Sequence, residues 1–219
     1  MSAKLWAEIG LGIYETFYMT LASTLLGYVI GLPLGVILIV TRRDGIRQNL
    51  AVNQVLGVIV NIMRSIPFLI LMIAIIPFTR FVMGKSYGST ATIVPLTMAA
   101  FPFISRMVES SLAEVDGGVI EAAQAMGATP LQIIRKVYLP EATPSLISGA
   151  AIVATNILGY SAMAGSVGGG GLGAIAINYG YYRFNAEVMV VCIAIMVVLV
   201  QAMQLVGTRL SVQLDHRLR

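Results

Sequence analysis

The sequence predicts an all-α integral membrane protein with five transmembrane helices, and its composition and its apolar segments carry that prediction. Hydrophobic residues make up 58% of the 219 positions and charged residues only 11%, whereas soluble domains carry about 25% charged residues. The apolar segments approach the ~20 residues that a helix needs to cross a bilayer. They are expected at residues 17–40, 64–78, 92–107, 145–164 and 186–206. Five such spans leave room for one domain, residues 1–219.

Basic residues are distributed unequally between the two ends of these segments. Of the 14 Lys and Arg, ten fall on the cytoplasmic side and four on the other side if the N-terminus is outside and the C-terminus inside. The ten are Arg42, Arg43, Arg47, Arg64, Arg106, Arg135, Lys136, Arg209, Arg217 and Arg219. Cytoplasmic loops are enriched in Lys and Arg, so the pattern predicts an N-out, C-in chain. These residues flank apolar segments and form no patch with aromatic side chains, which argues against a nucleic-acid partner.

The first segment carries three glycines at four-residue intervals, Gly27, Gly31 and Gly35. This spacing puts them on one helix face, and small residues let another helix approach closely. We expect that face to pack against a neighbouring span. A lipid-facing surface that happens to carry glycine is the alternative, since glycine is common in membrane helices.

The second span is harder to bound. Residues 50–63 are apolar with a few amides, which suits either an interfacial helix or the early part of a longer span. Arg64 is expected at the cytoplasmic start of the span, near the inner surface. Its side chain can then extend to the headgroups, or it can bind a substrate carboxylate.

The third span contains Pro95 and Pro102. Proline leaves backbone carbonyls without helical partners, and neighbouring helices or water must satisfy them. We therefore expect this helix inside a bundle or beside a pathway. The polar stretch that follows, about 114–142, is cytoplasmic by the alternation of spans.

A break inside this polar stretch is predicted by its residues. An Ala-rich helix through Glu121 ends at Gly127, a residue suited to the left-handed conformation that terminates helices. A second helix begins at once, because Thr129 can cap it, Pro130 fits its first position, and Gln132 completes a capping box. The stretch is thus predicted to be a helix–turn–helix.

The second short helix is predicted to be amphipathic. Leu131, Ile134 and Tyr138 are expected on one face, with the basic residues elsewhere, and Pro140 is expected to end the helix at or before Leu139. A helix that merely lies on the membrane surface is the alternative interpretation.

The last two spans differ in composition. Thr143 and Pro144 are expected to cap and open the fourth span, whose many small residues are typical of a tightly packed inner helix. Asn156 lies in its middle, where it either bonds to a neighbouring helix or binds a ligand. The fifth span starts at Ala186 after an aromatic belt that includes Phe184.

The polar stretch resembles the EAA loop in the permease subunits of bacterial ABC importers. The resemblance rests on Glu121, Ala122, Ala123, Gly127, Leu139 and Pro140. It implies a type I importer permease fold and a coupling helix that docks on a cytoplasmic ATPase. The residues implied in this coupling are Glu121, Ala122, Ala123, Met126, Gly127, Ala128, Leu139 and Pro140.

Further stretches narrow the resemblance to the methionine importer permease. They are the sequences RSIPF (64–68), IPFTR (76–80), YSAM (160–163) and VGGGGLG (167–173). The resemblance implies a homodimer in the bacterial inner membrane, served by two ATPase subunits and an extracytoplasmic methionine-binding protein. Another amino acid or organic solute as cargo, and a channel that works without an ATPase, stay open.

No catalytic, cofactor or metal site is expected. One histidine cannot supply a catalytic triad, and no midspan carboxylate offers a proton relay. A secondary transporter normally has ionisable groups at the midplane, so a permease driven by a partner ATPase is favoured. The residues expected along the pathway or gate are Arg64, Tyr160, Ser161 and Met163, although a methionine is also a common core filler.

Overall fold

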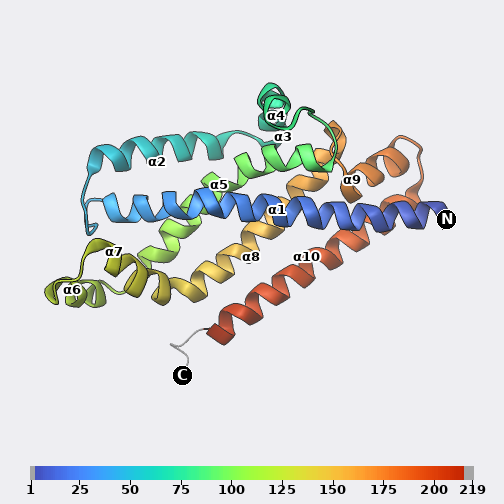
Figure 1. Ribbon diagram of the computed structural model, residues 1–219. Coiled ribbons are helices and arrows are strands. Elements are labelled where there is room, and N and C mark those ends of the chain that lie inside the picture. The colour runs from blue at the N-terminus through green and yellow to red at the C-terminus, as the bar shows by residue number, and fades with distance from the viewer. Residues whose placement is uncertain (1–2, 215–219) are drawn as a thin grey trace.

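The computed structural model describes residues 3–214, which form helices and loops without a strand (Figure 1). The long helices are α1 (Ala3–Thr41), α2 (Leu50–Ser65), α5 (Ser89–Ala113), α8 (Leu139–Ala164) and α10 (Ala186–Leu214). The short helices are α3 (Phe68–Ala74), α4 (Ile76–Met83), α6 (Gly117–Ala125), α7 (Pro130–Ile133) and α9 (Gly171–Ile175). Two π-helical turns, Ile134–Tyr138 and Ala176–Tyr181, and a 3₁₀ turn, Gly165–Val167, complete the chain. Arg217 and Arg219, counted above as cytoplasmic, lie outside the described residues.

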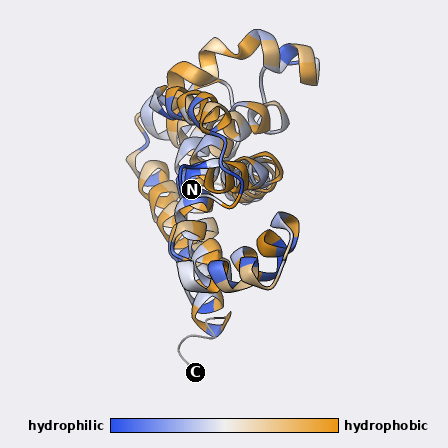
Figure 2. Ribbon diagram, turned by 90° about the vertical axis from the view of Figure 1, so that its left-hand side faces the viewer, coloured by the Kyte–Doolittle hydropathy of each residue, from blue (hydrophilic) through white to orange (hydrophobic). Residues whose placement is uncertain are grey.

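Four helices of the described chain are long and apolar enough to cross a bilayer: α1, α5, the continuous helix Pro130–Val167, and α10. A fifth span results if α2 and α3 are counted together, although they are bent by 101° at a short break. Figure 2 shows hydrophobic residues over most of these helices. A helix that is apolar all round suits lipid or a membrane bundle.

Helices α1 and α5 form the most extensive contact of the fold, and the three glycines of α1 lie in it. A Cβ added to Gly31 would lie 2.8 Å from the backbone oxygen of Phe101 on α5. At Gly35 it would lie 2.6 Å from the backbone oxygen of Ser105. The expectation that this face packs closely on another helix is confirmed.

Helix α2 runs beside α1 and also contacts α5 (Figure 1). Ile66 then adopts an extended backbone (φ −79°, ψ 122°) because Pro67 disfavours a helical conformation in the residue before it, and the chain turns into α3. The expectation that Arg64 starts the second span stays a prediction. Arg64 lies in the last turn of α2, about 21 Å along the helix from Leu50 at a rise of ~1.5 Å per residue.

Pro140 and Thr143, near the start of the fourth span, do not end or cap a helix as predicted. The helix does not end before Pro140; it passes through the π-helical turn Ile134–Tyr138 directly into α8. Pro140 is the second residue of α8 and lies directly after the π-helical turn, and local π-helical adjustments of this kind accommodate a proline inside a membrane helix. Thr143 does not cap a helix: its hydroxyl donates to the carbonyl of Leu139 at 2.8 Å, inside α8.

The end of the bundle near the N-terminus is held by two polar side chains of α1. The Glu15 carboxylate accepts a hydrogen bond from the backbone N–H of Gly171 at 2.7 Å, and the Thr16 hydroxyl accepts one from Leu172 at 2.9 Å. Gly171 has a φ of +80°, which glycine adopts without strain. The glycine-rich segment after α8 is therefore folded tightly against α1.

Candidate functional site

The helix–turn–helix predicted between the third and fourth spans is present as α6, a turn and α7. Gly127 has a φ of +79°, the left-handed conformation expected of it. The Gln132 side chain accepts from the backbone N–H of Thr129 at 2.8 Å, and the Thr129 hydroxyl accepts from the N–H of Gln132 at 3.4 Å. This reciprocal capping box confirms the predicted start of the second short helix. We call residues 117–138 the coupling loop.

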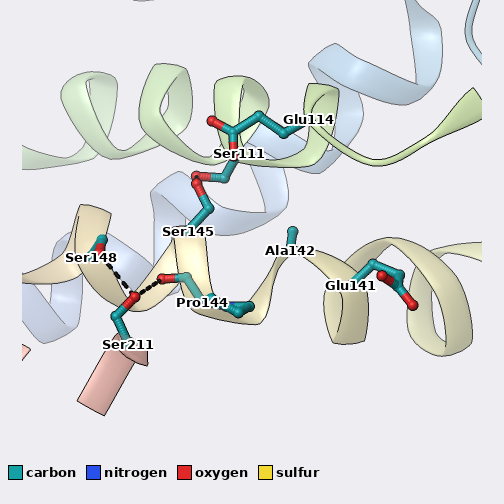
Figure 3. Close-up of a pocket in the computed structure, with 8 residues that line it drawn as sticks. All are labelled: Ser111, Glu114, Glu141, Ala142, Pro144, Ser145, Ser148 and Ser211. Carbon is teal, nitrogen blue, oxygen red and sulfur yellow. Dashed lines mark hydrogen bonds between the residues drawn. The ribbon is translucent and has the colours of Figure 1, made fainter. Parts of the chain in front are cut away.

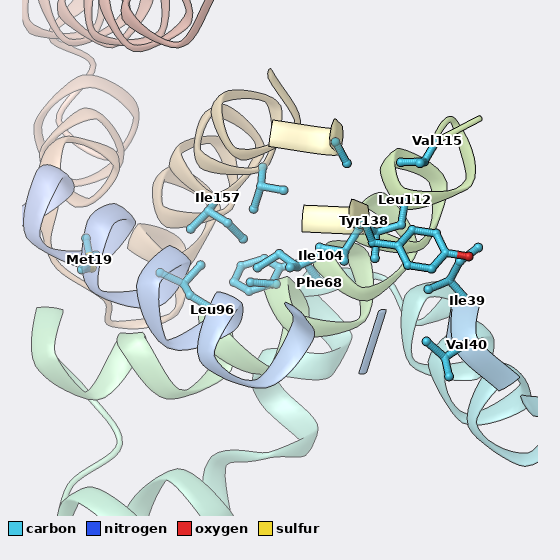
Figure 4. Close-up of a cluster of buried hydrophobic side chains, with 14 of the residues drawn as sticks. Met19, Ile39, Val40, Phe68, Leu96, Ile104, Leu112, Val115, Tyr138 and Ile157 are labelled. Atoms are coloured by element: carbon cyan, nitrogen blue, oxygen red, sulfur yellow. The ribbon is translucent and has the colours of Figure 1, made fainter. Parts of the chain in front are cut away.

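The coupling loop is anchored in the core by Ile133 and Tyr138, which are both buried. Figure 4 shows the Tyr138 ring beside Leu112 of α5 and Ile39 of α1. The prediction that Leu131 shares this face is wrong, because Leu131 is 57% exposed. The π-helical turn adds a residue to the helical repeat, so side chains five positions apart come to share the buried face.

The opposite surface of the coupling loop is open. Met126 is 82% exposed, and Glu121 and Ala122 are exposed beside it. Ala123 is buried and Ala128 is partly buried, so these two help to seat the loop. Exposed large apolar side chains such as Met126 and Leu131 are typical of a surface that another protein covers.

Leu139 and Pro140, at the far end of the predicted coupling segment, belong to the first turn of α8. Leu139 is partly buried against the core and Pro140 is exposed. These two residues therefore connect the coupling loop to a long helix without an intervening hinge loop.

Serine hydroxyls fix the beginning of α8 against its neighbours, around a cavity of about 310 Å³ (Figure 3). Ser145 donates to Ser111 of α5 at 3.0 Å, and Ser148 donates to Ser211 of α10 at 3.0 Å. Ser211 in turn donates to the carbonyl of Pro144 at 2.7 Å. The beginning of α8 is thus hydrogen-bonded to both α5 and α10.

A second cavity, of about 250 Å³, lies between α2, α3, α5 and α8. It brings Arg64 and Tyr160, both predicted for the pathway, to one place. The Arg64 guanidinium carbon lies 5.7 Å from the centre of the Phe103 ring. The Tyr160 ring stacks on Phe68, with centroids 4.8 Å apart and planes 6° from parallel. We call this space the aromatic cavity.

The other two predicted pathway residues lie apart from the aromatic cavity. Ser161 is buried, and its hydroxyl donates to the Leu158 carbonyl of its own helix at 2.7 Å. Met163 is 48% exposed and does not line the aromatic cavity. A role of Ser161 and Met163 in the pathway stays a prediction.

Two residues that line the aromatic cavity, Phe68 and Phe103, were not predicted. Each stands directly after a proline, at RSIPF and at PF in residues 102–103. The preceding proline does not by itself indicate them, because Phe78 also follows a proline and does not line the cavity.

A cluster of polar side chains lies near the N-terminus. The Tyr179 hydroxyl donates to the Glu8 carboxylate at 2.6 Å, and the Arg183 guanidinium stacks on the Tyr179 ring at 4.3 Å. The bond to Glu8 raises the pKa of the Tyr179 phenol above its ordinary value. Within residues 3–214 no group of His, Cys, Asp and Glu is arranged to hold a metal ion.

Comparison with known proteins gives the family. Residues 20–219 match the family described as binding-protein-dependent transport system inner membrane component. The chain belongs to this family. Its role is therefore that of a membrane component of a transport system, and its location is the inner membrane.

Relatives within the family agree with this assignment. The chain is 51% identical over 204 residues to the probable D-methionine transport system permease protein MetI of Vibrio cholerae serotype O1, covering 93% of this chain and 91% of that protein. It is 54% identical over 154 residues to D-methionine transport system permease protein MetI of Escherichia coli (strain K12), covering 70% and 71%.

Solved structures give the same fold. The chain matches a structure of the MetNI methionine ABC transporter, in an inward-facing conformation, with a TM-score of 0.97 at 49% identity, over 99% of this chain and 100% of that chain. It also matches an amino acid ABC transporter at a TM-score of 0.79, where the identity of 19% supports the shared fold alone. The fold is that of the ABC importer permeases.

Proposed function

We propose that this chain is the membrane-spanning permease subunit of an ATP-driven methionine importer. The observation that carries the proposal is the match to the MetNI transporter over nearly the whole chain in both fold and sequence. The relatives above, named as methionine permeases, support the same substrate. The chain itself contributes the pathway, and a partner supplies the energy.

We further propose five spans with the N-terminus outside and the C-terminus inside. In this arrangement α2 and α3 form one bent span, and α1, α5, α8 and α10 are the other four. The excess of Lys and Arg at one side supports it. The coupling loop then faces the compartment that contains ATP.

The proposed assembly has two copies of this chain, two cytoplasmic ATPase subunits and an extracytoplasmic methionine-binding protein. Two exposed apolar side chains of the coupling loop, Met126 and Leu131, offer the ATPase a docking surface. The family description, binding-protein-dependent, supports the external partner. The exposed apolar side of α10 suits membrane lipid, with Val190, Val197 and Val198 at its surface.

The proposed mechanism moves the coupling loop as a rigid unit. When the two ATPase subunits close on ATP, they favour one position of the loop over the other, and such a difference in affinity is what shifts a two-state equilibrium. Tyr138 carries the movement into the core, and the serine contacts at Ser145 and Ser148 carry it into α5 and α10. The pathway then opens alternately to each side.

Methionine uptake in proteoliposomes tests this function. The permease, its ATPase and the binding protein together are expected to accumulate labelled methionine only when ATP is present on the ATPase side. Uptake that needs no ATPase would support a channel instead. Accumulation of a different amino acid but not of methionine would show that the same machinery has another cargo.

The charge of the coupling loop gives a sharper version of the same test. Glu121 is exposed, so Glu121→Lys is expected to insert and fold normally. It should lower methionine uptake per ATP hydrolysed at least several-fold, because the reversed charge faces the ATPase. The matched control is Arg80→Glu, also a charge reversal at an exposed position, on α4. Unchanged coupling in Glu121→Lys would argue against a contact at this position.

A further inference from the structure

We propose that the aromatic cavity binds an α-amino acid inside the membrane-spanning part of the chain, with Arg64 pairing with the carboxylate and the aromatic rings contacting the side chain. The inference rests on the proposed function and deepens it, because it gives the transported substrate a defined site. Its basis is the joint placement of one available cation and three rings around one cavity.

Two arginines of the helix pair α2 and α5 differ in their hydrogen bonds and ion pairs. Arg106 of α5 is fully engaged: it pairs with Glu109 at 2.6 Å and donates to the Asn61 side chain at 3.0 Å. Arg64 of α2 contacts the Phe103 ring, and the ion pairs found among residues 3–214 do not include it. Arg64 therefore keeps guanidinium N–H groups available for a ligand.

The position of Arg64 along the α2–α3 unit also supports the proposed site. It stands in the last turn of the 16-residue helix α2, just before α3, so it lies inside the bent α2–α3 unit and not at an end of it. A charged side chain within a membrane segment is costly unless it pairs or faces a polar cavity, and such residues mark substrate pathways. A carboxylate is the partner that the planar guanidinium binds best.

The remaining walls of the aromatic cavity include three aromatic rings. Phe68 and Tyr160 are stacked and Phe103 lies opposite Arg64, so the cavity offers ring faces and edges as well as a cation. Thioether sulfur makes favourable contacts with aromatic rings, and an ammonium group is attracted to ring faces. At about 250 Å³ the cavity is smaller than the roughly 300–1,000 Å³ that hold drug-sized ligands, which suits a single amino acid.

Photo-methionine, a diazirine analogue that keeps the amino and carboxylate groups, is the probe that tests the site. It is added to the purified complex of permease and ATPase, irradiated, and its attachment points on the permease are mapped by mass spectrometry. We expect labelled peptides that contain Met63, Phe103 or Tyr160. Excess methionine should prevent this labelling, and methionine amide, which lacks the carboxylate, should prevent it at least tenfold less well.

Variants of Arg64 separate recognition from folding. Arg64→Gln is expected to reduce labelling of the cavity about 10- to 100-fold, since a charged hydrogen bond contributes roughly that factor. Arg64→Lys should retain part of it. Arg80→Gln, which removes an exposed arginine of α4 that does not line the cavity, is the control and should label normally. Elution of each complex at the wild-type volume in gel filtration shows that it is folded.

Two results would overturn the inference. One is wild-type labelling that avoids α2, α3, α5 and the part of α8 near Tyr160. The other is unchanged labelling in a folded Arg64→Gln complex. Failure of the proposed function gives a different result, namely no ATP-dependent methionine uptake by the wild-type system, so the two failures are distinguishable.

Discussion

Helices α1 and α5 pack together along a contact surface that contains Gly27, Gly31 and Gly35, which we call the seam. The seam and the coupling loop both require glycine, but for different reasons. In the seam, a Cβ at Gly35 would lie 2.6 Å from the Ser105 carbonyl oxygen and 2.6 Å from the Val108 Cβ. In the loop, a Cβ at Gly127 would have nothing within 4 Å, and the backbone there has a φ of +79°. The seam requires glycine for space, and the loop requires it for conformation.

This difference shows which region is scaffold and which is contact surface. The neighbours of Gly31 and Gly35 include backbone oxygens of α5, at Phe101 and Ser105, which cannot move without displacing a whole helix. Packed interiors of this kind transmit strain. The loop glycine lies at the surface, so a change there alters the local path of the chain and leaves the core intact. The predictions below test this division, from the largest expected effect to the smallest.

Gly35→Val should have the largest effect. Overpacking typically costs ~1–3 kcal/mol, and we expect at least the upper end of that range because the clash is with backbone. The measurement is thermal unfolding and yield of the purified complex. Gly10→Val is the matched control in the same helix, where a Cβ meets nothing within 4 Å. Equal stability of the two variants would contradict the space argument.

Gly127→Val should have an intermediate effect of a different kind. A non-glycine residue in the left-handed region costs ~1–2 kcal/mol, which changes the turn between α6 and α7. The complex should remain folded, while methionine uptake per ATP hydrolysed falls. Asparagine tolerates this conformation better, so Gly127→Asn should keep most of the coupling. If valine and asparagine behave alike, conformation is not what the position requires.

Thr129→Ala should have the smallest effect. It removes the hydroxyl of the capping box, and loss of such a cap costs ~1 kcal/mol. The start of α7 is expected to exchange its amide hydrogens faster, with uptake only slightly lowered. Thr129→Ser keeps the hydroxyl and should match the wild type. Equal exchange in the alanine and serine variants would show that the cap does not stabilise α7.

The local structure of the coupling loop could be predicted because its causes are neighbours in sequence. The capping box joins residues three positions apart, and the left-handed turn at Gly127 depends on one residue. The buried face of α7 could not be predicted. On that face Ile133 is buried where Leu131 was expected. The π-helical turn that follows α7 shifts the helical repeat, and Tyr138 at the end of this turn is buried among Ile39 and Leu112.

The composition of the aromatic cavity could be predicted from the sequence even less than the buried face of α7. Arg64 and Tyr160 were expected along a pathway, but nothing in their spacing of nearly a hundred residues indicates that they share one cavity. The prediction put Arg64 at the start of a span because RSIPF precedes an apolar run. The structure starts the helix at Leu50 with Asn49 as its cap, and α2 contacts α5.

The sequence alone determined that this chain is an apolar helical protein of the importer permease type, with a capped and glycine-terminated loop between two long helices. These features follow from composition and from contacts within a few residues, which local sequence specifies. Only the tertiary structure decided the passage of the helix through Pro140 and the meeting of Arg64 with Tyr160. Those depend on packing between helices that are distant in the chain.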